Sequence, residues 1–148
     1  MSSMNVLPTS GAKARVFCAD DNPLVSDALR LFVLRSGEFD WAGCVPDADQ
    51  LCANVRAMGC PEIVLLDIDM PGMDPFTAIS QVAACCPETR VLMYSGMVRR
   101  DLIDRAIEAG AWGYVSKGDG EQALFEAMRT ALDGQIAMSP EVRAVAGL

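Results

Sequence analysis

The sequence predicts an α/β fold in which helices cover both faces of a parallel sheet. Five short apolar runs rich in β-branched residues alternate with segments in which apolar residues recur every three or four positions. The apolar runs are continuous, as in parallel strands that are buried on both faces. The length of 148 residues is typical of one domain. Successive strand–helix units of this kind form a parallel sheet through right-handed crossovers.

The expected strands are the five continuous apolar runs, at residues 15–19, 39–45, 62–66, 90–94 and 112–115. Helix boundaries follow from capping residues and helix breakers. Asn22 is a good N-cap and Pro23 suits the first helical position, so the first helix begins there. The second begins at about Asp47, and the third follows the loop at residues 70–74. The five helices end at residues that terminate helical structure, namely Gly37, Gly59, Pro87, Gly110 and Gly134.

The composition excludes several classes of function. Twenty acidic residues against twelve basic ones give a net charge of −8, and histidine is absent. We therefore expect no direct binding of nucleic acid by this chain, and no histidine-ligated zinc or histidine-dependent hydrolysis. The apolar runs are too short to cross a membrane, and residues 1–13 lack the apolar core of a signal peptide. We expect a cytoplasmic protein with a disordered tail at residues 1–13.

The six cysteines lie mostly within apolar stretches, and no two have C-x-x-C spacing. We expect them to be reduced and to act as small core residues. The adjacent pair Cys85 and Cys86 is the one candidate redox feature.

Polar side chains follow four of the five expected strands. Asp20 and Asp21 follow the first strand, Asp67 the third, Ser95 the fourth and Lys117 the fifth. The carboxyl ends of parallel strands meet at one edge of the sheet, where ligands bind in such folds. Each residue alone has an ordinary explanation in capping, in a turn or on a solvated surface. The ordered set predicts a functional site.

Three neighbouring carboxylates repel one another and need a cation, and oxygen ligands without His or Cys favour Mg²⁺. A carboxylate beside Mg²⁺ can attack a phosphoryl group, whose oxygens then need an ammonium and a hydroxyl donor. We therefore predict that Asp67 is the nucleophile and that Asp20 and Asp21 bind the metal. Ser95 and Lys117 would contact the phosphoryl oxygens.

Four motifs in order resemble the receiver (CheY-like) domain of bacterial two-component response regulators, over residues 14–134. They are Asp20-Asp21, Asp67 with the loop at 70–74, Ser95-Gly96, and the run from Gly110 to Lys117. The resemblance implies a flavodoxin-like sheet of five strands in the order 2-1-3-4-5. Residues 135–148 would then be a tail or the start of a linker. The chain is most similar to receivers that precede a LuxR-type helix-turn-helix, and it is either a single-domain regulator or a fragment of a longer transcription factor.

The resemblance also implies a phosphoacceptor switch. A sensor histidine kinase would donate the phosphoryl group to Asp67, and the chain would catalyse only its own phosphorylation and dephosphorylation. Asp21 and Asp67 would bind Mg²⁺ directly, Asp20 through water, and Asp69 through its backbone carbonyl.

The switch itself would consist of Ser95 and Tyr114, which would move together and change the face formed by the fourth helix, fifth strand and fifth helix. A homodimer formed on phosphorylation is a further implied interaction.

Two alternatives remain open at this point. Leu65 to Asp69 also resembles the first motif of haloacid-dehalogenase-type phosphatases, with Asp67 as nucleophile and Asp69 as general acid. The other alternative is a receiver fold used only for binding, without phosphorylation. Two positions depart from the receiver pattern: Pro75 replaces a usual glycine, and Gly118 replaces a frequent proline, so no cis peptide bond is assumed after Lys117.

Overall fold

The computed structural model describes residues 12–148, so residues 1–11 of the expected N-terminal tail lie outside the described residues. The sheet has six strands in the order β2-β1-β3-β4-β5-β6, and every neighbouring pair is parallel. The flavodoxin-like order of the first five strands is therefore confirmed, and a sixth strand is added. The strands are β1 Ala14–Ala19, β2 Phe39–Val45, β3 Ile63–Leu66, β4 Arg90–Ser95, β5 Gly113–Ser116 and β6 Ala137–Met138.

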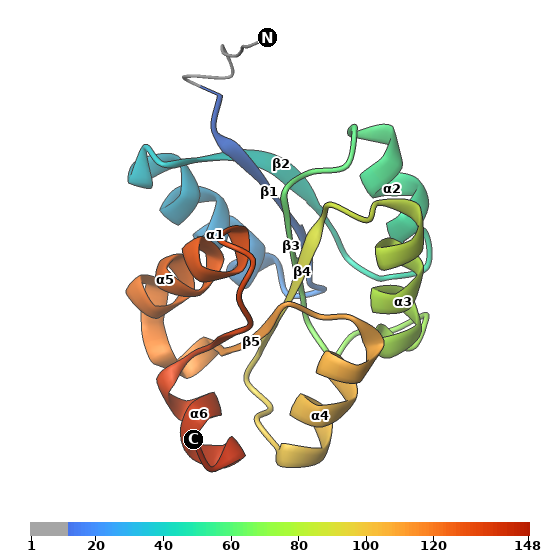
Figure 1. Ribbon diagram of the computed structural model, residues 1–148. Coiled ribbons are helices and arrows are strands. Elements are labelled where there is room, and N and C mark those ends of the chain that lie inside the picture. The colour runs from blue at the N-terminus through green and yellow to red at the C-terminus, as the bar shows by residue number, and fades with distance from the viewer. Residues whose placement is uncertain (1–11) are drawn as a thin grey trace, which may run out of the picture.

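Helices cover both faces of the sheet (Figure 1): α1 and α5 lie on one side, and α2, α3 and α4 lie on the other. A short 3₁₀ turn, η1 Lys117–Asp119, joins β5 to α5. The α-helices are α1 Pro23–Ser36, α2 Leu51–Ala57, α3 Pro75–Cys85, α4 Arg100–Ala109, α5 Gly120–Leu132 and α6 Pro140–Ala146. Within the described residues, no helix is long and apolar enough to cross a membrane.

Successive residues of each strand point to opposite faces and so build two cores. In β3, Val64 and Leu66 pack on the side of α2, α3 and α4, while Ile63 and Leu65 pack on the side of α1 and α5. All four side chains are at most 1% exposed. The continuous apolar run that predicted this strand reflects burial on both faces.

The local signals placed most helix ends correctly. The Asn22 side chain accepts a hydrogen bond from the Leu24 amide, and Gly37 ends α1 in a left-handed conformation. The second helix begins later than expected, at Leu51 rather than near Asp47. The Asp47 side chain instead accepts a hydrogen bond from the amide of Asp49, and this local turn competes with helix formation.

The C-terminal segment expected to be a tail or a linker contains β6 and α6 instead. Gly113 lets β6 approach β5, because a Cβ at this position would lie 2.4 Å from the carbonyl oxygen of Ala137. Val142 of α6 is fully buried against the core on the side of α4. We call residues 137–146 the C-terminal strap.

The expectation of reduced core cysteines is wrong for four of the six. Disulfides join Cys52 to Cys85 and Cys60 to Cys86, with Cα–Cα distances of 6.5 and 5.6 Å. Only Cys18 is a fully buried free cysteine, and Cys44 is partly buried. Sequence spacing gave no signal for the pairing, because the partners come from α2 and its following loop on one side and from the end of α3 on the other.

Candidate functional site

The structure brings the predicted polar residues together at the carboxyl edge of the sheet. Asp20 and Asp67 directly follow β1 and β3, Ser95 ends β4, and Lys117 follows β5. Asp20, Asp67 and Ser95 are buried, whereas Asp21 is exposed. The strand ends therefore place carboxylates, a hydroxyl and an ammonium in one small region, as expected for an open parallel sheet.

Asp20, Asp21 and Asp67 form an acidic cluster in which one carboxylate oxygen of each lies within 4.8 Å of the others. Burial raises the pKa of Asp67, the charge of Asp20 adds to this rise, and the ammonium of Lys117 opposes it. A buried carboxylate of this kind is stabilised by a nearby cation. The donor set consists only of carboxylate oxygens, which fits a hard divalent cation such as Mg²⁺.

Lys117 is the positive group that faces this cluster. Its ammonium donates hydrogen bonds to Asp20 at 2.8 Å and to Asp67 at 3.3 Å. Burial alone would lower the pKa of Lys117, but the hydrogen bond to Asp20 and the charge of Asp67 together raise it. Lys117 therefore stays charged and holds two buried carboxylates that would otherwise repel each other.

Ser95, Met97 and Tyr114 form a hydrogen-bonded group beside the acidic cluster. The Ser95 hydroxyl accepts a hydrogen bond from the Met97 amide at 3.0 Å, and the Tyr114 hydroxyl donates one to the Met97 carbonyl. Tyr114 is fully buried, so its ring already points inward in this structure. Burial raises the pKa of Tyr114 to about 12, which keeps its hydroxyl protonated.

An open cavity of about 420 Å³ lies next to Asp67. Its walls come from the loops that follow β3, β4 and β5, and it is lined by Asp67, Asp69, Ser95, Gly96, Met97 and Lys117. A phosphoryl group entering this space would meet a carboxylate, a hydroxyl and an ammonium together. The arrangement suits nucleophilic attack by Asp67 with charge stabilisation by Lys117.

The loop between β3 and α3 is held by Asp49, which lies outside the motifs identified from the sequence. The Asp49 carboxylate accepts a hydrogen bond from the Met73 amide at 2.7 Å. It packs so closely on Gly72 that a Cβ there would lie 2.4 Å from Asp49 Oδ1. The departure at Pro75 is accommodated because Pro75 is the first residue of α3, behind the N-cap Asp74.

Other predicted features of these loops are placed as follows. Asp69 is exposed, and its amide donates a hydrogen bond to Asp67 Oδ1 at 3.3 Å. Among residues 12–148 no peptide bond is cis, so the bond between Lys117 and Gly118 is trans. Ser139 and Glu141 of the C-terminal strap contact the loop that carries Lys117, and neither residue belongs to a motif identified from the sequence.

We expect Mg²⁺ to raise the midpoint of thermal unfolding, because an ion held by the folded acidic cluster would favour the folded state over the unfolded chain. The raised pKa of Asp67 means that ionisation of this group costs folding stability, and the cost appears as pH rises through the folded pKa. Mg²⁺ offsets that cost, so its stabilising effect should grow as pH rises through the folded pKa of Asp67. Differential scanning fluorimetry with and without Mg²⁺ measures this effect. An equal gain in Asp67→Asn would show that the ion binds elsewhere.

Comparisons with known proteins point to one family. Residues 16–129 match the family model described as "Response regulator receiver domain". The chain is 28% identical over 127 residues to "Probable transcriptional regulatory protein SgaR" of Hyphomicrobium methylovorum, covering 86% of this chain and 60% of that protein. It is 31% identical over 124 residues to a protein-glutamate methylesterase/protein-glutamine glutaminase of Pseudomonas aeruginosa, covering 79% of this chain but 35% of that protein.

A solved structure agrees with the family match. It is a two-component response regulator of the LuxR family from Aurantimonas sp. SI85-9A1, with a TM-score of 0.85 and 27% identity, and the match covers 91% of this chain and 96% of that one. The present chain spans 60% and 56% of the first two curated relatives. The similarity to those longer proteins therefore concerns their receiver segment and not their remaining parts.

Proposed function

Because this chain belongs to the receiver domain family of two-component response regulators, we propose that it is a phosphoacceptor switch in which Asp67 accepts the phosphoryl group. The observation that carries this proposal is the position of Asp67. Its carboxylate is buried at the end of β3, lies 3.3 Å from the ammonium of Lys117, and borders an open cavity of about 420 Å³. The family implies a sensor histidine kinase as the donor.

In the proposed reaction a carboxylate oxygen of Asp67 forms a bond to phosphorus, and the bond from phosphorus to the donor breaks. Lys117 and Ser95 donate hydrogen bonds to the phosphoryl oxygens and so stabilise their charge in the transition state. Mg²⁺, when bound, would supply the positive charge that lets an anionic carboxylate approach an anionic phosphoryl group. Its proposed ligands are Asp20, Asp21, Asp67 and the backbone carbonyl of Asp69.

We further propose that the side chains of Ser95 and Tyr114 respond to the phosphoryl group on Asp67. The Ser95 hydroxyl would turn from the Met97 amide toward the phosphoryl oxygens. Since the Tyr114 hydroxyl is bonded to the carbonyl of the same Met97, a shift of this loop reaches the ring directly. The ring of Tyr114 is fully buried here, and phosphorylation would stabilise this arrangement of the face formed by α4, β5 and α5.

The chain would have no catalytic role beyond its own phosphorylation and dephosphorylation. The haloacid-dehalogenase alternative gains no support, because residues 16–129 match the receiver family. We propose that the chain controls transcription through a DNA-binding partner or domain and self-associates on phosphorylation. The net charge of −8 disfavours direct contact between this chain and nucleic acid.

The test is the intact mass of the protein after incubation with acetyl phosphate and Mg²⁺. We expect wild type to gain one phosphoryl group, about 80 Da, and Asp67→Ala to gain none, because the nucleophilic oxygen is lost. Asp40→Ala, which removes an exposed carboxylate on β2, is the matched control and should label like wild type. Labelling of Asp67→Ala would refute Asp67 as the acceptor. Continuous turnover of small phosphate esters would favour the phosphatase instead.

A further inference from the structure

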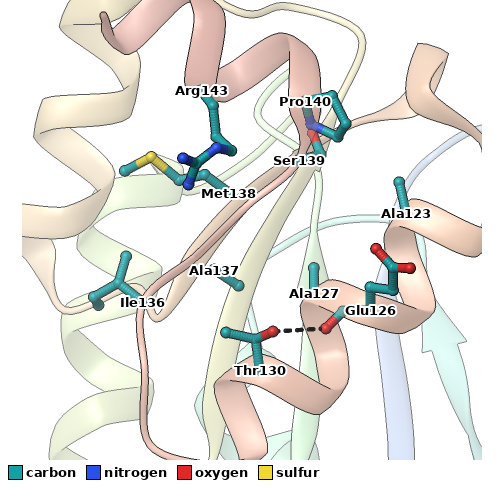
Figure 2. Close-up of a pocket in the computed structure, with 10 residues that line it drawn as sticks. All are labelled: Ala123, Glu126, Ala127, Thr130, Ile136, Ala137, Met138, Ser139, Pro140 and Arg143. Carbon is teal, nitrogen blue, oxygen red and sulfur yellow. Dashed lines mark hydrogen bonds between the residues drawn. The ribbon is translucent and has the colours of Figure 1, made fainter. Parts of the chain in front are cut away.

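The C-terminal strap is attached to the loop that carries Lys117. β6 pairs with β5 at Gly113 and Tyr114, and α6 lies below β5 beside α4 (Figure 1). A pocket of about 170 Å³ lies between the strap and α5. Figure 2 shows this pocket, with Glu126 and Thr130 of α5 on one side and Met138 to Pro140 of the strap on the other.

The strap forms hydrogen bonds with residues that lie on both sides of Lys117 in the sequence. On the N-terminal side, the Ser116 amide donates a hydrogen bond to the Ser139 hydroxyl at 2.9 Å, and the Ser116 hydroxyl donates one to the Glu141 carboxylate. On the C-terminal side, the Glu141 amide donates a hydrogen bond to the Asp119 carboxylate at 2.9 Å. Ser116 and Ser139 are 1% and 3% exposed, so water does not readily replace these bonds.

Glu141 also fixes the direction of the Ser116 hydroxyl. A hydroxyl has one proton, and Glu141 accepts it. The oxygen of Ser116 then accepts a hydrogen bond from the Gly118 amide at 3.1 Å, which closes the turn around Lys117. Glycine at position 118 does not restrict the backbone by itself. Glu141, acting through Ser116, supplies the restraint on this turn.

The orientation of this turn determines where the ammonium of Lys117 lies. Lysine has a long, flexible side chain, and its ammonium must lie between Asp20 and Asp67 to act on both. Small displacements of a charged group at a reaction centre slow the reaction strongly. A restraint on the backbone of residues 116–119 therefore acts on the chemistry at Asp67.

We propose that Glu141, supported by Ser139, is a positioning residue for phosphorylation, and that the C-terminal strap is part of the phosphoacceptor machinery. This inference rests on the proposed function of Asp67 and Lys117. Coupling is reciprocal, so a movement of Lys117 toward a phosphoryl group would in turn act on α6. The strap thereby provides a direct connection from the acceptor site to the C-terminal end of the domain.

The test compares rates of phosphorylation by acetyl phosphate in wild type, Glu141→Ala and Glu141→Gln. We expect Glu141→Ala to be about tenfold slower, within the roughly 100-fold that a misplacement of about 1 Å at a reaction centre can cost. Glu141→Gln keeps an acceptor for the Ser116 hydroxyl and should be close to wild type. Glu126→Ala removes an equal charge from the other side of the pocket in Figure 2, without touching the Lys117 loop, and is the matched control.

A double-mutant cycle separates positioning from general damage. In a Lys117→Ala background, Glu141→Ala should slow phosphorylation no further, because its effect passes through the ammonium. Hydrogen exchange at the Gly118 amide should be faster in Glu141→Ala and unchanged in Glu126→Ala. An equal slowing in both backgrounds, or a wild-type rate in Glu141→Ala, would overturn the inference. Failure of wild type to gain a phosphoryl group would instead overturn the proposed function.

Discussion

Replacing Lys117 by alanine is expected to slow phosphorylation of Asp67 by at least about 100-fold, the usual effect of removing one preorganised donor from a charged transition state. The ammonium contacts Asp20 at 2.8 Å and Asp67 at 3.3 Å, so it lies where charge gathers on the transferred oxygens. Without it, two buried carboxylates remain beside an incoming anion. The rate is measured by intact mass over time with acetyl phosphate and Mg²⁺.

The matched control is Lys13→Ala, which removes an exposed lysine that precedes β1. It should phosphorylate at the wild-type rate. Circular dichroism of Lys117→Ala establishes that the variant is folded before its rate is interpreted. A rate for Lys117→Ala within about threefold of wild type, far below the effect typical of such donors, would show that Lys117 does not contact the phosphoryl group in the transition state.

The second large effect is on stability. We expect Tyr114→Ala to lower the free energy of unfolding by about 3–5 kcal/mol, since a fully buried aromatic ring is lost from the core that contains Leu102 and Val142. Tyr114→Phe keeps the ring and loses only the hydrogen bond to the Met97 carbonyl, so it should cost about 1 kcal/mol. Urea unfolding measures both values. Equal, small losses would show that the ring lies outside the core in solution.

The same residue gives a pH dependence with a definite sign. Burial raises the pKa of Tyr114 from an ordinary 10.0 to about 12. The folded protein therefore keeps a proton that the unfolded chain loses, and stability falls as pH rises from 10.0 to about 12. Tyr114→Phe removes this contribution, so its stability should fall less than that of wild type over the same range. An identical fall in both proteins would contradict a buried hydroxyl at this position.

Most of the fold was predictable because its signals are local. The continuous apolar runs specify doubly buried strands, as Val64 and Leu65 show by packing on opposite faces of β3. Asn22, Pro23 and Gly37 set the ends of α1 through bonds and conformations that involve only near neighbours in the sequence. The late start of α2 is also local, but there the Asp47 side chain formed a turn that competed with the helix.

The meeting of the site residues was predictable for a geometric reason. Asp20, Asp67, Ser95 and Lys117 each lie at the carboxyl end of a strand, and in a parallel sheet these ends share one edge. The strand order then places β1, β3, β4 and β5 side by side. The position of each residue at the end of a strand was therefore enough to predict that the four side chains lie close together, and no individual contact had to be known. The roles of these residues in phosphoryl transfer remain predictions for the experiments above.

The sequence by itself therefore determined the alternation of strands and helices, the edge at which the polar residues meet, and the family. Only the tertiary structure decided the β6–α6 strap, the two cysteine pairs, the contact of Asp49 with Gly72, and the inward position of Tyr114. These features join residues that lie far apart in the chain, and each requires two surfaces to fit. Hydrophobic periodicity and capping residues depend on neighbours in the sequence. They therefore do not predict contacts between distant surfaces, which form only when the sheet brings those surfaces together.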